Sequence, residues 1–358
     1  MEHINDYVKW RGDITFEDRP FCDIDNLVLC QFSYLDIPRR FTEESDVTIT
    51  GIVNMMREEA VPIRKKAADD SDRFRDFISK LASSTRFGTL EVHDFEDVID
   101  RDKDVQFSAM TITGQGICAV VFRGTDDTVV AWKEDFMICF TEPKAQKYAA
   151  FYLARAIKRY GGDTIVCGHS KGGNTALVSA LMTTPMRRKK IRMIYSNDGP
   201  GLRRRELMSK EYKSIRSKYK HIVPQNSIVG MMLRQDENFV VHSNQFGVLA
   251  HIPSSWEVID DKLRRSVLSS GSEALNKALV EWLDKHSDEE RLSLVNECFD
   301  LLVKSGINWT MDFRDPKKVM KAISMINTVP EDTRKLVLDV IKSCADRVSE
   351  ATIKNKNK

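Results

Sequence analysis

Apolar and polar positions alternate with different spacings along the chain. Two short apolar runs, Val105–Ile112 and Ile117–Phe122, flank a Thr-Gly-Gln-Gly turn, which predicts an antiparallel hairpin. Lys144–Tyr160 carries alanine, leucine and isoleucine at helical spacing and is followed by two glycines. Thr164–Cys167 and Ile191–Ser196 again have the composition of buried strands. This order of strand, helix and strand predicts an α/β fold with a doubly wound mixed sheet.

Helical spacing also dominates both ends of the chain. Residues 25–35 are predicted to form a packed helix. Segment 46–90 is more polar, but residues 72–81 place apolar side chains on one helical face, which predicts a helical insertion. This insertion is expected either to cover a site as a lid or to lie at the periphery. Residues 261–353 are wholly helical in pattern, which predicts a C-terminal helical module. Residues 354–358 are predicted to form a disordered basic tail.

The region between these parts completes the predicted α/β domain, residues 1–260. A polar helical stretch at 204–218 leads to a short strand at 219–224. Two apolar runs, Met231–Leu233 and Phe239–His242, then flank a polar turn, which predicts a second hairpin.

Composition and charge narrow the range of functions. Of the 358 residues, 30% are charged and 42% apolar, as in an ordinary soluble globular protein. A net charge of +2 argues against a nucleic-acid partner. The basic clusters Arg187–Lys190 and Arg203–Arg205 favour a solvated surface, with a phosphate or lipid-headgroup contact as the alternative. Transient contact with a membrane surface therefore stays open.

Targeting signals and cysteine usage indicate a compartment. The first residues lack the basic and apolar regions of a secretory signal, and the longest apolar runs are far below the ~18 residues that span a bilayer. The seven cysteines are scattered and include no Cys-x-x-Cys pair, which suits reduced thiols. We expect a cytoplasmic protein; the sequence does not indicate an oligomeric state.

The candidate chemistry centres on a Gly-x-Ser-x-Gly sequence at residues 168–172. It directly follows the strand at 164–167 and precedes a helical stretch from Asn174. A turn this tight requires glycine on both sides and predicts a strained backbone at the serine. Ser170 is therefore the candidate nucleophile, and the backbone N–H of Lys171 is a candidate oxyanion donor.

A serine hydroxyl needs a base that removes its proton. We favour His251, which is expected to follow a strand and to begin a loop; His242 is the alternative, while His169 is expected to fix the turn from inside it. Asp198 lies at the carboxyl end of the strand at 191–196, the edge of the sheet where catalytic loops gather, and is the preferred acid. Asp236 is expected to be a solvated turn residue.

A second oxyanion donor is expected after the strand at 117–122. Thr125 offers a backbone N–H and a hydroxyl there, and Gly124 allows close approach of a substrate. The alternative role of Thr125 is to cap the next segment.

Three of these motifs together resemble the class 3 (fungal-type) lipases of the α/β-hydrolase superfamily. They are Phe122–Thr125, Gly168–Gly173, and His251 followed by Trp256. Residues 26–35 and the Asp-Gly-Pro-Gly sequence from Asp198 are closer to a bacterial lipase-like family of unknown function. The resemblance covers about residues 1–260.

The resemblance implies an α/β-hydrolase fold, ester or lipid hydrolysis through an acyl-enzyme, and no metal or other cofactor. The chain departs from the class 3 pattern at Ser227-Ile228-Val229, where those lipases usually have Asp-x-Val. We expect a serine hydrolase that cleaves a small-molecule or lipid acyl ester. The alternative from another class is a non-catalytic binding or scaffold protein that retains the fold.

Overall fold

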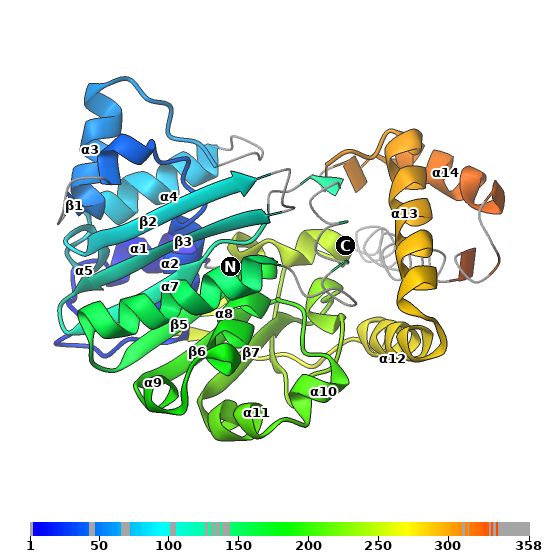
Figure 1. Cartoon of the computed structure of the whole chain (residues 1–358). Helices are drawn as coiled ribbons and strands as arrows, with labels where there is room; N and C mark the ends of the chain where they lie inside the picture. The colour runs from blue at the N-terminus through cyan, green and yellow to red at the C-terminus, as the bar shows by residue number, and fades with distance from the viewer. Residues whose placement is uncertain are drawn as a thin grey trace.

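An eight-stranded mixed sheet forms the centre of the chain, for which we use a computed structural model (Figure 1). It describes residues 3–42, 47–65, 72–100, 105–125, 128–129, 133, 137, 144–309, 312–313, 315–328, 331 and 334–335. The strands are β1 (Val47–Thr48), β2 (Glu91–Asp100), β3 (Val105–Gly114), β4 (Ile117–Phe122), β5 (Thr164–His169), β6 (Ile191–Asn197), β7 (Tyr219–Pro224) and β8 (Phe239–Val241).

The strands lie side by side in sequence order. β1 to β4 pair antiparallel, and β4 to β8 pair parallel. The predicted hairpin is β3–β4, with Ala109 opposite Phe122. The α/β class with a mixed sheet is confirmed, and the carboxyl ends of β4 to β8 meet along one edge.

Three helices cover one face of the sheet: α7 (Lys144–Tyr160), α8 (Lys171–Met182) and α11 (Lys210–Ile215) (Figure 1). Alternate residues of each strand turn toward them, so Val120 and Val166 share a hydrophobic core with their apolar sides. α7 has the bounds that its periodicity predicts.

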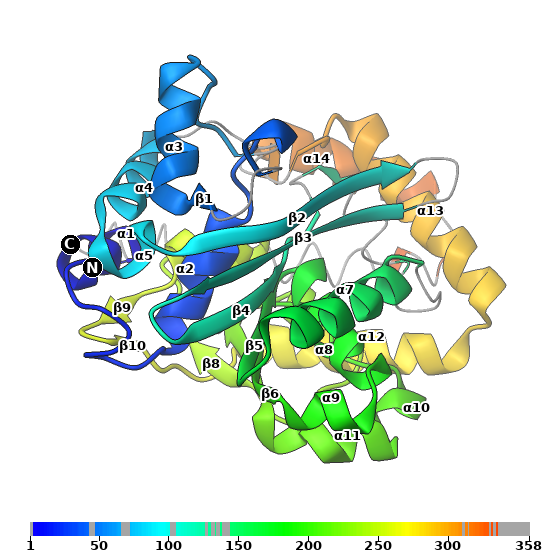
Figure 2. The same ribbon diagram turned by 60° about the vertical axis from the view of Figure 1, so that its left-hand side comes forward.

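The N-terminal helices cover the opposite face (Figure 2). They are α1 (Ile4–Arg11), α2 (Asp23–Phe32), α3 (Ile49–Glu58), α4 (Asp72–Ser83) and α5 (Thr85–Gly88). The predicted apolar face of α4, which includes Phe77 and Leu81, is buried in this core with α1 and α3. The lid role of segment 46–90 stays a prediction.

A buried ion pair links this N-terminal part. The Arg86 guanidinium binds both carboxylate oxygens of Asp25, at 2.9 and 2.7 Å, and its remaining donors bind backbone carbonyls such as that of Thr15. Tyr7 donates a further hydrogen bond to Asp25. Because both charges are fully buried, losing one partner would leave an uncompensated charge in the core.

The predicted second hairpin is wrong. Val229–Met231 forms the 3-10 helix η3, and β8 joins the sheet parallel to β7. The remaining short elements are η1 (Arg39–Thr42), α9 (Pro185–Lys189), α10 (Arg204–Leu207), η2 (Arg216–Lys218), η4 (Gly247–His251), η5 (Pro253–Ser255), β9 (Val258–Ile259), β10 (Lys262–Leu263) and η7 (Ile326–Thr328).

The predicted C-terminal helices begin at Ser270. They are α12 (Ser270–Lys285), α13 (Asp288–Ser305) and α14 (Pro316–Met325). Ser287 caps α13 with a capping box, and Gly306 ends it in the left-handed region. These helices share a separate hydrophobic core with η3 and Val129. The last part of the predicted helical module, beyond residue 335, and the basic tail at residues 354–358 lie outside the described residues. Within the described part, no helix is long and apolar enough to cross a bilayer.

Candidate active site

Ser170 lies between β5 and α8 in a backbone conformation that few residues adopt. Its φ is 59° and its ψ is −132°, a region that costs a residue with a side chain about 1–3 kcal/mol. A Cβ atom at Gly168 would overlap the backbone of Gly172, and one at Gly172 would overlap the carbonyl of Phe122. The strand, tight turn and helix expected from the motif are therefore present, for the expected steric reasons.

The tight turn at residues 168–172, which we call the elbow, is held against the end of β6. The Ser170 N–H donates to the carbonyl of Asn197 at 3.0 Å, and Gly199 is packed against the carbonyl of Ser170. The loop that carries Asp198 is therefore in direct backbone contact with the elbow. Ser170 itself is buried.

Asp198 and His251 are hydrogen-bonded partners. His251 Nδ1 lies 2.7 Å from Asp198 Oδ2, and both side chains are buried. A carboxylate can only accept, so neutral His251 carries its proton on Nδ1 and leaves Nε2 as the basic nitrogen. The sequence predicts that His251 follows a strand. Instead, His251 is the last residue of the 3-10 helix η4.

The second oxygen of Asp198 has its own donors. The Ser227 hydroxyl and the Gly230 N–H, the latter at 3.1 Å, both donate to Oδ1, which orients the carboxylate toward His251. Sequence reasoning missed both residues. The available signal was the departure from Asp-x-Val, because Ser227 occupies the position where class 3 lipases have the aspartate.

His169 joins the nucleophile turn to the His251 loop. Its Nε2 lies 2.9 Å from the His251 carbonyl, and its Nδ1 lies 2.9 Å from the Tyr34 hydroxyl on the N-terminal side. The two imidazole rings also pack together, with centroids 4.5 Å apart. Burial, with a smaller contribution from His251, holds the pKa of His169 well below its usual value. The neutral ring therefore donates from Nε2 and accepts from Tyr34 at Nδ1.

The two candidate oxyanion donors belong to segments that meet at the elbow. Lys171 is the first residue of α8. Gly124 lies against the His169 carbonyl and the Ser170 Cβ atom, and Thr125, the next residue, is buried. A larger residue at 124 would separate the β4 loop from the nucleophile turn, which accounts for the Arg-Gly-Thr sequence.

The alternative acid and base have other partners. His242 lies 2.9 Å from Glu257, and Asp236 lies 2.8 Å from Arg216 at a partly exposed position. Within the described ranges, no three or more histidine, cysteine, aspartate or glutamate side chains are grouped so as to hold a metal ion.

A mixed, mostly parallel sheet with a serine elbow at its carboxyl edge defines an α/β-hydrolase-like fold. The chain belongs to the Mbeg1-like family, whose model matches residues 81–300, more than half of the chain. This match spans the elbow, the Asp198 loop and His251. No curated protein matches the chain, and neither does any solved structure.

Proposed function

We propose that the protein is a serine hydrolase that cleaves an acyl ester through an acyl-enzyme on Ser170. The observation that carries the proposal is the buried hydrogen bond between His251 Nδ1 and Asp198 Oδ2, next to a serine held at a positive φ. A scaffold needs neither the strained serine nor a buried histidine whose Nε2 is kept basic. This arrangement favours the enzyme over the binding-protein alternative.

In the proposed reaction, Ser170 Oγ attacks the carbonyl carbon of the ester while His251 Nε2 takes the hydroxyl proton. Asp198 stabilises the imidazolium that forms. Collapse of the tetrahedral intermediate breaks the bond to the leaving alcohol, which receives the proton from His251. Water then attacks the acyl-enzyme by the same route and releases the carboxylic acid.

The N–H of Lys171 and the N–H or hydroxyl of Thr125 are proposed to bind the oxyanion of each intermediate. A donor of this kind contributes about 10²–10³-fold to the rate, about 3–4 kcal/mol of transition-state stabilisation. The proposed substrate is a small-molecule or lipid acyl ester, because these residues recognise only the carbonyl that reacts.

Labelling with a fluorophosphonate probe tests the nucleophile. The wild-type protein is expected to be labelled and Ser170→Ala is not, because the probe reacts with activated serine hydroxyls. Ser179→Ala, on the same helix, is the matched control and keeps full labelling. Hydrolysis of p-nitrophenyl esters of increasing acyl length then defines the acyl group that is accepted.

Two outcomes contradict the proposal. Equal labelling of Ser170→Ala would assign the reactivity to another residue. A folded wild-type protein that is neither labelled nor active on any ester of the series would support the binding-protein alternative.

A further inference from the structure

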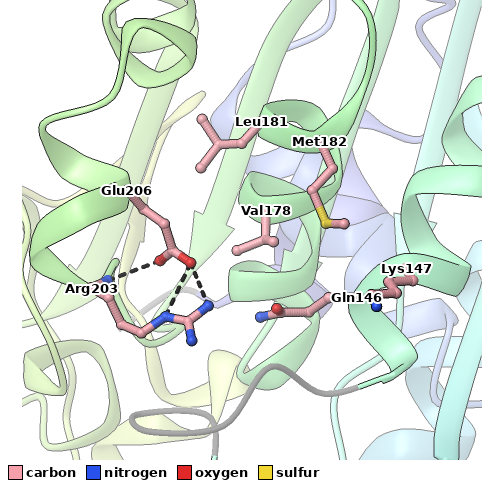
Figure 3. Close-up of a pocket in the computed structure, with 7 residues that line it drawn as sticks. All are labelled: Gln146, Lys147, Val178, Leu181, Met182, Arg203 and Glu206. Atoms are coloured by element: carbon pink, nitrogen blue, oxygen red, sulfur yellow. Dashed lines mark hydrogen bonds and ion pairs between the residues drawn. The ribbon is translucent and has the colours of Figure 1, made fainter.

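A small cavity lies on the flank of α8, away from the candidate active site (Figure 3). Its volume is about 120 Å³. Val178, Leu181 and Met182 of α8 form its apolar floor, Lys147 lies on the α7 side, and Arg203 lies on the α10 side. The cavity therefore lies between the basic cluster Arg203–Arg205 and the end of α8. The chain leads from that end of α8 into the other basic cluster, Arg187–Lys190.

Large apolar side chains protrude from α8 and from the elements next to it. Phe151, one turn beyond Lys147 on α7, is 79% exposed, and Met208, just after α10, is 66% exposed. Met182 at the end of α8 and Met186 on α9 are 48% and 81% exposed. One such residue is ordinary on a protein surface, but several on neighbouring elements mark an interaction site. We call these four residues and the cavity the α8 flank.

Cations on the α8 flank are available for a ligand. Arg188 is buried and donates to the carbonyl of Leu181, so its role is structural. Arg203 is paired with Glu206. Five cations in or next to the α8 flank have no ion-pair partner among the described residues: Lys147, Arg187, Lys189, Lys190 and Arg204. The flank therefore combines protruding apolar groups with excess positive charge.

We propose that the α8 flank docks onto the surface of a bilayer that contains anionic lipids. Apolar side chains of this size can enter the boundary between headgroups and acyl chains, while lysine and arginine attract the lipid phosphates. A bilayer is favoured over a protein partner because the apolar groups protrude and the surrounding unpaired charges include five cations. Met182 and Met186 are flexible enough to adapt to lipid packing.

The proposed docking does not depend on the chemistry of Ser170. Ser170 precedes α8, and Met182 ends it after 12 residues. At 1.5 Å per residue this separates the two by roughly 18 Å along the helix. The contacts proposed for Met182 and Met186 would therefore lie at the end of α8 that points away from Ser170.

Vesicle sedimentation with the full chain tests the proposal. We expect the protein to sediment with vesicles of phosphatidylcholine and phosphatidylglycerol, but not with phosphatidylcholine alone, and to be released by salt. Met182→Ser/Met186→Ser and Lys189→Glu/Lys190→Glu should each weaken binding roughly tenfold. These positions are largely exposed, so folding is preserved.

Matched controls lie outside the α8 flank. Val267, 84% exposed, and Lys262, exposed on β10, are replaced by serine and glutamate. Both controls, and Ser170→Ala, should bind like the wild type. Binding to neither vesicle type, or equal weakening by control and flank variants, would overturn the proposal.

Two further measurements test whether a different ligand occupies the α8 flank. Release by millimolar glycerol 3-phosphate would assign the cations to a free phosphate ester rather than a bilayer. A concentration-dependent dimer that is lost in Met182→Ser/Met186→Ser, without vesicle binding, would assign the flank to a second copy of the chain. Either result would overturn membrane docking.

Discussion

Replacing Asp198 with asparagine tests the proposed acid by reversing one hydrogen bond. The carboxylate accepts from Ser227 and Gly230 at Oδ1 and from His251 at Oδ2. An asparagine must place its oxygen toward the two donors and its NH₂ group toward His251 Nδ1. The opposite orientation would leave two buried donors without acceptors, at about 1–3 kcal/mol each.

The preferred orientation makes Nδ1 of His251 an acceptor and moves its proton to Nε2, so the base toward Ser170 is lost. The negative charge that stabilises the imidazolium is lost as well. A wrong tautomer with otherwise intact geometry lowers kcat by about 10⁴-fold, equivalent to about 5.5 kcal/mol. The assay is kcat/KM for a short p-nitrophenyl ester, with circular dichroism to verify the fold.

Asp236→Asn is the matched control, because Asp236 is the other aspartate considered as the acid and is paired with Arg216 at a partly exposed position. It should retain wild-type activity. A folded Asp198→Asn variant with less than tenfold loss, or a larger loss in Asp236→Asn, would refute the assignment of Asp198.

Three further results are expected. Ser170→Gly should be more stable than Ser170→Ala by about 1 kcal/mol in thermal unfolding, because only glycine adopts φ 59° without strain; greater stability of the alanine variant would contradict this. Burial lowers the pKa of His169 and His221 below 6.5, so the unfolded chain binds more protons below that pH. Stability should therefore be full above about pH 6.5 and fall on acidification by up to about 1.4 kcal/mol per pH unit for each histidine, as measured by urea unfolding; an unchanged slope in His221→Gln would count against it. Arg86→Met should cost about 3–5 kcal/mol in the same assay by leaving Asp25 unpaired, and a loss below 1 kcal/mol would show that the pair contributes little.

The fold was predictable where short-range pattern decides it. The spacing of alanine and leucine identified α7 with its correct ends, and two apolar runs around a glycine turn identified β3 and β4. The turn at Ser170 was predictable because steric overlap at Gly168 and Gly172 leaves few alternatives.

The region after β7 was not predictable in the same way. Met231–Leu233 has strand-like composition, but Met232 and Leu233 are buried against the C-terminal helices, while Met231 packs with Val223 and Val240. These long-range contacts outweigh the local preference for a strand. β8 is only three residues long and pairs with β7 parallel rather than with a neighbouring segment. A local hairpin pattern gives no information about such distant contacts.

The proposed acid shows how a departure from a motif carries information. Ser227 stands where class 3 lipases have an aspartate, and its hydroxyl donates to Asp198 instead. The negative charge thus comes from the end of β6, and the turn after β7 supplies neutral donors that hold it. A residue-by-residue comparison would report a missing acid, whereas hydrogen-bond geometry gives His251 a buried carboxylate partner.

His169 explains how two loops far apart in sequence keep a common geometry. It precedes Ser170 in the chain, donates to the carbonyl of His251, and accepts from Tyr34. A shift of the His251 loop would break a buried hydrogen bond and disturb the ring packing at once. The elbow, β6 and the His251 loop are therefore held in place by contacts that do not involve Ser170 Oγ, and the proposed hydroxyl nucleophile can be replaced while its surroundings remain assembled.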